Sequence, residues 1–242
     1  MDIYGIIGNP LGHSFSKRFF TDKFSREALD AEYRNFEIPG IDSLPDILRQ
    51  NPGLKGLNVT LPYKTAVIPY LHELSPEAQE IGAVNVIRVR DGMLKGFNSD
   101  IIGFSESIRP LLKPHHRHAL ILGTGGASKA VRVGLSHLGI DWTYVSRMPR
   151  EGMLCYDELI PEVMIRYQVI VNCSPVGMFP HEDDCPDIPY HMLNETHLLY
   201  DLVYNPGETL FMKRGAEQGA TVKNGLEMLH LQAIASWKFW NE

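Results

Sequence analysis

Several features that would assign this 242-residue chain to particular protein classes are missing from its sequence. Its three cysteines, Cys155, Cys173 and Cys185, form no C-x-x-C pair, so neither a disulfide framework nor a zinc site is predicted. The formal net charge is −6 and there is no dense run of lysine or arginine, which argues against nucleic acid or an anionic membrane as a partner. We therefore expect a reducing compartment and a small-molecule ligand.

Long apolar runs are also absent. No stretch approaches the roughly 20 apolar residues of a membrane span, and residues 1–5 lack the basic and apolar regions of a secretory signal. The sequence thus predicts a cytoplasmic protein that does not enter a membrane. His115, His116 and His118 cluster without neighbouring carboxylates, so we expect surface histidines and no metal.

The N-terminal half alternates strand-like and helical patterns, which is typical of an α/β layer. Asp91-Gly92 tolerates the positive φ angles of a tight turn and predicts an antiparallel hairpin at an edge of the sheet. The apolar spacing from Ile101 to Leu112 predicts a helix that links two domains. Strands are expected at residues 3–8, 33–38, 57–60 and 84–90, and helices at 43–50 and 76–81.

The C-terminal half has the order of a doubly wound, Rossmann-type domain. An apolar strand at 119–122 leads into a glycine loop and a helix at 127–138, which is the order that a phosphate cradle requires. Further strands are expected at 143–146, 169–172, 198–202 and 220–222, and a last helix at 226–240. We therefore predict an N-terminal α/β substrate domain, residues 1–102 and 226–242, and a dinucleotide-binding Rossmann domain, residues 103–225.

The glycine loop has the residues of a dinucleotide cradle. Gly123 would allow the tight turn and Gly125 the approach of a pyrophosphate, whereas Ser128 stands at the third glycine position. By itself the loop is equally compatible with a structural turn. After the second strand the chain continues Ser146-Arg147, where an NAD-selecting site would have an acid, so NADP is favoured. Arg147, with a further charge from Arg150, could bind a 2′-phosphate, although both could also be solvated surface arginines.

Two candidate proton-transfer residues precede the glycine loop. Lys64 follows Pro62, which should end a strand and leave the lysine at the strand end, where α/β sheets place ligand groups. A lysine beside the carboxylate of Asp100 could relay a proton to a substrate oxygen. The alternatives are a surface lysine and a helix N-cap. Uncharged hydrogen-bonding groups suited to a hydroxylated or carboxylated ligand are Ser14, Ser16, Thr60, Asn85 and Gln232.

Eight motifs in this order, within residues 6–232, resemble the shikimate dehydrogenase family. They are His13-Ser14-Phe15-Ser16, residues 58–64 (NVTLPYK), Gly82-Ala83-Val84-Asn85, Asn98-Ser99-Asp100, residues 123–128 (GTGGAS), 174–178 (SPVGM), 201–206 (DLVYNP) and 224–229 (NGLEML). The resemblance implies reversible NADP-dependent interconversion of 3-dehydroshikimate and shikimate, a step of aromatic amino acid biosynthesis, with Lys64 in acid-base catalysis and Asp100 as its partner.

The resemblance also implies the ligand contacts. Substrate contacts are expected at Ser14, Ser16, Thr60, Asn85, Tyr204 and Gln232. Cofactor contacts are expected at Gly123, Thr124, Gly125, Gly126, Ala127, Ser146, Arg147, Leu202 and Gly225. The protein is expected to be a monomer or a homodimer.

Several residues depart from the family pattern. Lys17 stands where the family usually has proline, and Ser99 replaces the usual threonine before Asp100. The interval from Arg147 to Leu159 is too short for the family's full helix, so we expect weaker cofactor affinity with selectivity for NADP retained. The sequence ends soon after Gln232, which predicts a less covered substrate domain. A relative acting on quinate or another cyclic hydroxy acid, and a non-catalytic NADP-binding sensor, remain alternative functions.

Overall fold

The protein forms two compact units, each built on its own sheet. The computed structural model describes residues 1–12 and 15–242. The first unit contains residues 1–99 and 232–242, and the second contains residues 100–231. The last helix, α9 (Leu226–Asn241), contributes to both units, because Met228 packs in a core of the second whereas Trp240 packs in a core of the first. The observed boundary between the units therefore lies inside α9, where the first unit resumes at residue 232. The sequence predicted that it would resume at residue 226, which is six residues earlier.

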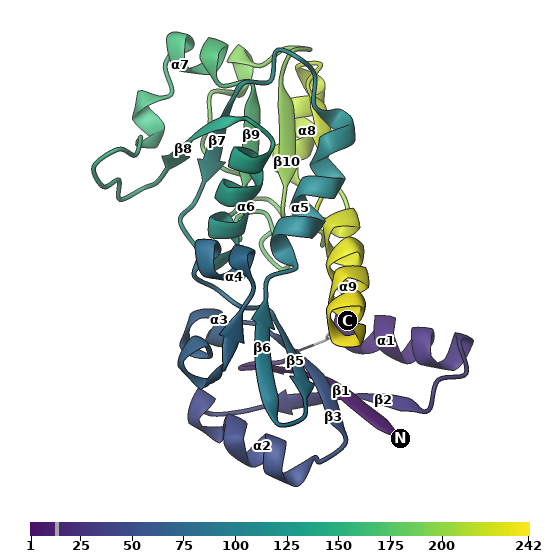
Figure 1. The fold of residues 1–242 in the computed structure, drawn as a ribbon. Coiled ribbons are helices and arrows are strands. Elements are labelled where there is room, and N and C mark those ends of the chain that lie inside the picture. The colour runs from purple at the N-terminus through teal and green to yellow at the C-terminus, as the bar shows by residue number, and fades with distance from the viewer. Residues whose placement is uncertain (13–14) are drawn as a thin grey trace. The chain divides into compact units, whose positions relative to one another are not determined.

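The first unit contains a mixed six-stranded sheet in the order β2-β1-β3-β5-β6-β4. Strand β1 is parallel to β2 and β3, whereas β5 is antiparallel to β3 and β6. The hairpin turn has positive φ at Asp91 (51°) and Gly92 (75°), as the sequence predicts. The strands, labelled in Figure 1 except for the short β4, are β1 (Asp2–Gly8), β2 (Ala31–Glu37), β3 (Leu54–Val59), β4 (Glu73–Leu74), β5 (Val86–Arg90) and β6 (Met93–Phe97).

The hairpin does not form the sheet edge, contrary to the prediction. The short strand β4 pairs in parallel with β6 outside it, through Glu73 opposite Lys95 and Leu74 opposite Gly96. Two residues cannot produce the alternating pattern by which a strand is recognised in a sequence. The prediction therefore missed a strand that is fixed by pairing rather than by local sequence.

Alternate residues of β1 face two hydrophobic cores. Ile3 and Ile7 belong to one core, and Tyr4 and Ile6 belong to the other, as the two-residue period of a strand requires. The helices that cover this sheet are α1 (Phe15–Arg26), α2 (Leu44–Gln50), α3 (Tyr63–Ala66), α4 (Pro76–Ile81) and the last part of α9.

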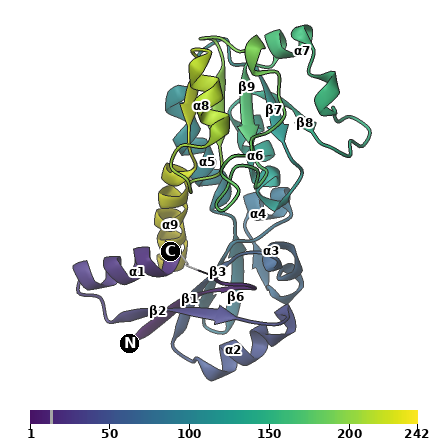
Figure 2. The same cartoon turned by 180° about the vertical axis from the view of Figure 1, so that it is seen from behind.

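The second unit is a doubly wound parallel sheet in the order β11-β10-β9-β7-β8, which confirms the Rossmann-type prediction. Phe104 and Val131 pack on one face, and Met164 and Phe211 on the other, as Figure 2 shows for the helices that carry them. The elements are α5 (Asp100–Ile108), β7 (His118–Leu122), α6 (Gly126–His137), β8 (Asp141–Val145), α7 (Pro161–Arg166), β9 (Val169–Asn172), β10 (Leu198–Asp201), α8 (Leu210–Glu217) and β11 (Thr221–Lys223).

The connection from β8 to β9 has no full-length helix, as its short sequence suggests. It contains a 3₁₀ turn at Tyr156–Glu158 and then α7, which has six residues. Leu154 pairs with Val145 at the end of β8, and its amide donates to the Tyr144 carbonyl oxygen over 2.9 Å. The connection therefore folds back along β8 before α7 begins.

One of the histidines predicted to lie on the surface is buried. Nδ1 of His116 accepts a hydrogen bond from the Lys113 amide and Nε2 contacts the Thr196 carbonyl oxygen, each over 3.0 Å. These backbone partners satisfy both ring nitrogens, which explains why His116 is only 5% exposed.

Among residues 1–12 and 15–242, no group of three or more His, Cys, Asp or Glu side chains is arranged to hold a metal ion. Within the same described ranges, no helix is long and apolar enough to cross a membrane.

Candidate functional site

The glycine loop forms an open cradle between β7 and α6. Gly123 has a φ of +98°, which favours glycine, and its amide donates to the Val145 carbonyl oxygen over 3.0 Å. A Cβ atom at Gly125 or Gly126 would meet no protein atom within 4 Å, so the space above the start of α6 is clear. The N–H groups at the start of a 12-residue helix face this space and favour an anion. The loop therefore fits the pyrophosphate of a dinucleotide.

Ser128, at the third glycine position, is compatible with this cradle. Its side chain is completely buried, and its hydroxyl donates to the Gly125 carbonyl oxygen over 2.7 Å. This local bond satisfies the only polar group that serine adds. The departure from the glycine pattern thus leaves the turn and the helix packing intact.

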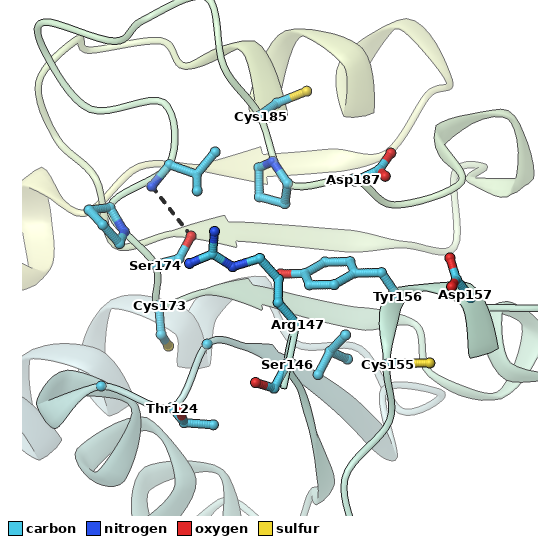
Figure 3. Close-up of a pocket in the computed structure, with 16 residues that line it drawn as sticks. Thr124, Ser146, Arg147, Cys155, Tyr156, Asp157, Cys173, Ser174, Cys185 and Asp187 are labelled. Carbon is cyan, nitrogen blue, oxygen red and sulfur yellow. Dashed lines mark hydrogen bonds between the residues drawn. The ribbon is translucent and has the colours of Figure 1, made fainter. Parts of the chain in front are cut away.

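A pocket of about 600 Å³ lies beside the loop (Figure 3). Its lining includes Gly123, Thr124, Gly125, Ser146 and Arg147, so five of the predicted cofactor residues share one cavity. Gly126, Ala127, Leu202 and Gly225 are not part of this lining, and neither is Arg150. The other lining residues are Val145, Cys155, Tyr156, Asp157, Cys173, Ser174, Pro175, Val176, Cys185, Pro186 and Asp187.

All three cysteines line this pocket, and each is a free thiol that is partly buried. Burial, together with the charge of Asp201, raises the pKa of the Cys173 thiol far above its usual range. A thiol with so high a pKa is held neutral and is a poor nucleophile.

The pocket contains two acids and one cation. Arg147 is the only Lys or Arg among its lining residues, whereas Asp157 and Asp187 are the carboxylates. Sequence reasoning found Arg147 because it directly follows the second strand. It missed Tyr156, Asp157 and Asp187, because they enter the pocket from later loops whose positions no local pattern specifies.

The backbones of Leu202 and Gly225 approach each other closely. A Cβ atom at Gly225 would lie 2.2 Å from the Leu202 carbonyl oxygen, so only glycine permits this approach. The Gly225 amide also donates to the Val203 carbonyl oxygen over 3.1 Å. The structure thus brings these two predicted cofactor residues together, although neither lines the pocket.

Asp201 anchors the end of β10. Its Oδ1 atom accepts from Asn172 Nδ2 and the Val203 amide, both over 3.0 Å, and its Oδ2 atom accepts from Thr209 Oγ1 over 2.7 Å. Burial raises the pKa of this carboxyl to about 6, and the three hydrogen bonds oppose the rise. Asp201 therefore fixes the loop that precedes the exposed Tyr204.

In the first unit, hydrogen bonds bring two predicted substrate residues, Thr60 and Asn85, to one end of the sheet. The β5–β6 hairpin places Asn85 opposite the chain that follows β6, where Asn85 Oδ1 accepts from the Ser99 amide over 2.7 Å and Asn85 Nδ2 donates to Ser99 Oγ over 3.1 Å. The Val59 amide donates to the Asn85 carbonyl oxygen over 2.9 Å, which brings the adjacent Thr60 to the same end.

Lys64 lies in the single turn of α3 rather than at a strand end, which corrects the prediction from Pro62. Its side chain is half-buried, and its carbonyl oxygen accepts from the Val84 amide over 2.7 Å. Pro62 redirects the chain into a helical turn, and this pairing fixes the turn next to Asn85. Lys64 belongs to the first unit, whereas the buried Asp100 opens α5 at the start of the second.

A second polar cluster in the first unit centres on Asn58, which was not predicted as a site residue. The Tyr33 hydroxyl donates to Asn58 Oδ1 over 2.8 Å, and Asn58 Nδ2 donates to Ser236 Oγ over 3.0 Å. Burial raises the pKa of Tyr33 well above its usual range, whereas a hydrogen bond with Ser16 opposes the rise. Asn58 opens the motif that contains Lys64, so its place in that motif was the available signal.

Gln232, another predicted substrate residue, lies in α9. Gln232 accepts a hydrogen bond at its carbonyl oxygen from Ser236 Oγ over 2.8 Å and is half-buried. Ser14 lies outside the residues that the structure describes.

Comparisons with known proteins show which family the chain resembles. A family model for the shikimate dehydrogenase substrate binding domain matches residues 6–87. A shikimate dehydrogenase (NADP(+)) of Clostridium beijerinckii is 36% identical over 252 residues, which cover 100% of this chain and 93% of that protein.

Solved structures are similar to nearly the whole chain as well. The chorismate mutase/shikimate 5-dehydrogenase fusion protein of Clostridium acetobutylicum has a TM-score of 0.88 and 35% identity, covering 99% of this chain and 91% of that one. Shikimate 5-dehydrogenase of Thermus thermophilus, solved with NADP(H) and shikimate, has a TM-score of 0.87 and 30% identity, covering 99% and 92%. The chain belongs to the shikimate dehydrogenase family.

Proposed function

We propose that this protein catalyses the reversible, NADP-dependent oxidation of shikimate to 3-dehydroshikimate. The observation that carries the proposal is the retention of Lys64 and Asp100, in their family motifs, in a chain whose second unit has an open dinucleotide cradle. A sensor that had lost catalysis would not need an acid-base pair. The domain roles follow: the first unit binds the substrate and the second binds NADP.

The cradle residues fit NADP. The backbone of residues 123–127 would hold the pyrophosphate, and Ser146 and Arg147 would lie at the adenosine end, where no acid replaces the arginine. Leu202 and Gly225 would lie along the cofactor through their closely apposed backbones. When bound there, NADP would supply the acceptor for the hydride of the substrate's carbinol carbon, and NADPH would supply the hydride in the reverse reaction.

The protein side chains move the proton. In the oxidation, Lys64 Nζ in its neutral form would take the hydroxyl proton from the substrate as the hydride leaves the same carbon, and Asp100 would balance the resulting ammonium charge. In the reduction, the Lys64 ammonium would return the proton to the developing alkoxide. Ser14, Ser16, Thr60, Asn85, Tyr204 and Gln232 would bind the ring hydroxyl and carboxylate groups and fix the ring for this transfer.

The direct test is the rate of NADPH formation when the purified protein is mixed with shikimate and NADP, with Lys64→Ala as the comparison. We expect turnover in the wild type and a much larger loss of kcat than of shikimate affinity in the variant, because Lys64 acts mainly in the transition state. An unchanged kcat would refute the role of Lys64.

Parallel reactions with quinate and with NAD distinguish the alternatives. Faster oxidation of quinate would keep the mechanism and change the substrate, whereas faster reduction of NAD would overturn the role of Arg147 in selecting the 2′-phosphate. Binding of NADP without turnover of either cyclic acid would favour the sensor. We further propose a cytoplasmic location, which suits three free thiols, and a monomer or homodimer.

A further inference from the structure

The loop that replaces a full crossover helix after β8 builds one wall of the dinucleotide pocket. Because the Leu154 amide and carbonyl oxygen pair with Tyr144 and Ser146, both over 2.9 Å, the returning chain runs beside the end of β8. Tyr156 follows two residues later, as the first residue of the 3₁₀ turn. The shortened connection therefore delivers an aromatic side chain to a pocket that Arg147 enters from β8.

Tyr156 and Arg147 face each other across this part of the pocket. Figure 3 shows the Tyr156 hydroxyl directed toward the Arg147 side chain, and the charge of Arg147 acts on the phenol. Among the described residues, none forms a hydrogen bond or ion pair with the exposed Arg147 guanidinium. Its five N–H donors thus remain available to a ligand.

Charge alone would give this pocket a poor preference for a phosphate dianion. One guanidinium shares the lining with the carboxylates of Asp157 and Asp187, so the charged side chains sum to one negative charge. The negative charge of Asp187 also acts on Tyr156. A neutral hydrogen-bond donor next to the guanidinium would add affinity for phosphate oxygens without adding a further charge.

We propose that Tyr156 is a specificity-determining residue of this chain, whose hydroxyl, together with the Arg147 guanidinium, binds the 2′-phosphate of NADP. This inference rests on the proposed use of NADP in this pocket. The hydroxyl donates to a phosphate oxygen while the guanidinium supplies the opposite charge. Burial raises the pKa of Tyr156 and thereby keeps the phenol protonated as a donor.

The experiment measures the binding of adenosine 2′,5′-bisphosphate and of adenosine 5′-monophosphate to the wild type and to Tyr156→Phe by calorimetry. The two probes differ only in the 2′-phosphate. We expect the variant to bind the bisphosphate about tenfold more weakly and the monophosphate unchanged, as for loss of one hydrogen bond to a charged group. In steady-state kinetics the KM for NADP rises while kcat with saturating NADP is retained.

Tyr167→Phe is the matched control, because the Tyr167 hydroxyl contacts Thr143 Oγ1 over 3.0 Å and Tyr167 does not line the pocket. Equal bisphosphate affinity in the wild type and Tyr156→Phe would overturn the proposal, as would an equal loss for both probes. A wild type with no preference for the bisphosphate would overturn both the NADP subsite and the role of Tyr156. Selective loss of bisphosphate binding in a protein that does not oxidise shikimate would support Tyr156 while refuting the proposed function.

Discussion

Asn85 and Ser99 form a paired contact in which the Asn85 side chain both accepts from the Ser99 amide and donates to the Ser99 hydroxyl, over 2.7 and 3.1 Å. Ser99 directly precedes Asp100, the proposed partner of Lys64, so this contact fixes the backbone next to Asp100. The carbonyl oxygen of Lys64 accepts a hydrogen bond from the amide of Val84, the residue before Asn85. The segment Val84-Asn85 thus holds the chain next to both proposed proton-transfer residues.

Replacing Asn85 with alanine should therefore impair both binding and chemistry. The variant loses the side-chain oxygen that accepts a hydrogen bond from the Ser99 amide. We expect kcat/KM for shikimate to fall at least tenfold, with a rise in KM and a fall in kcat. The loss of two buried hydrogen bonds should also lower the free energy of unfolding by about 2 kcal/mol. Steady-state kinetics and urea denaturation measure the two effects.

Asn51→Ala supplies the control, because Asn51 also uses its amide for two hydrogen bonds in the first unit, with Arg34 and Ile47, but is not a proposed site residue. Its kcat/KM should equal that of the wild type even if its stability falls. If both variants lose activity in proportion to their stability, Asn85 has no special role in the site.

The sequence predicted those parts of the fold that have strong local signals. Strand β9 matches its predicted range, Asp91-Gly92 forms the expected turn, and the glycine loop stands between a strand and a helix. Apolar periodicity and turn residues specify such features within a few residues. Thr60 and Asn85 were predicted as site residues because they are uncharged hydrogen-bonding groups that lie in two of the family's motifs.

Features fixed by distant pairing were not predictable in this way. Pro62 indicated a strand end at Lys64, whereas the Val84 amide supports a helical turn there. Tyr156 lines the pocket because Leu154 pairs with β8, and His116 is buried because the Thr196 carbonyl oxygen lies within reach. These contacts join segments that are far apart in the sequence, and no local pattern in either segment predicts its partner.

Gly225→Ala should destabilise the second unit. The added Cβ atom would lie 2.2 Å from the Leu202 carbonyl oxygen, and because that atom belongs to the backbone, one of the two segments must move. We expect the free energy of unfolding to fall by about 2 kcal/mol or more, and the KM for NADP to rise as the chain beside the cradle shifts. Thermal unfolding and cofactor kinetics measure the two changes.

The comparison variant for this prediction is Gly207→Ala, since a Cβ atom at Gly207 meets nothing within 4 Å. It should change the free energy of unfolding by no more than about 0.5 kcal/mol. Equal free energies of unfolding for the two alanine variants would show that the backbones of Gly225 and Leu202 move apart without loss of stability.

The buried carboxyl of Asp201 should make stability depend on pH in a defined direction. Its folded pKa is about 6 and its unfolded reference is 3.8, so between these values the folded protein binds more protons than the unfolded chain. The contribution of this group to stability therefore falls as the pH rises through that window, by up to about 3 kcal/mol.

Asp201→Asn removes the ionisation while keeping an oxygen that can accept from Asn172 and Val203. The difference in the free energy of unfolding, variant minus wild type, should rise between pH 4 and pH 7 and then remain constant. Urea denaturation across this range measures it, with the exposed acid Asp183→Asn as a control that gives a flat difference. A flat difference for Asp201→Asn as well would mean that the folded pKa of Asp201 is not raised.

Asp187→Asn should strengthen the binding of NADP. Asp187 shares the pocket lining with Arg147, and its negative charge would repel the 2′-phosphate proposed to bind there. Removing that charge should lower the KM for NADP about threefold at low ionic strength, with a smaller effect in high salt because ions screen an exposed charge. The KM for NAD, which lacks the phosphate, should change less.

Asp183→Asn, on the same segment but outside the pocket lining, should leave both constants unchanged. An equal decrease in the KM values for NADP and NAD would place the repulsion at the pyrophosphate rather than at the 2′-phosphate.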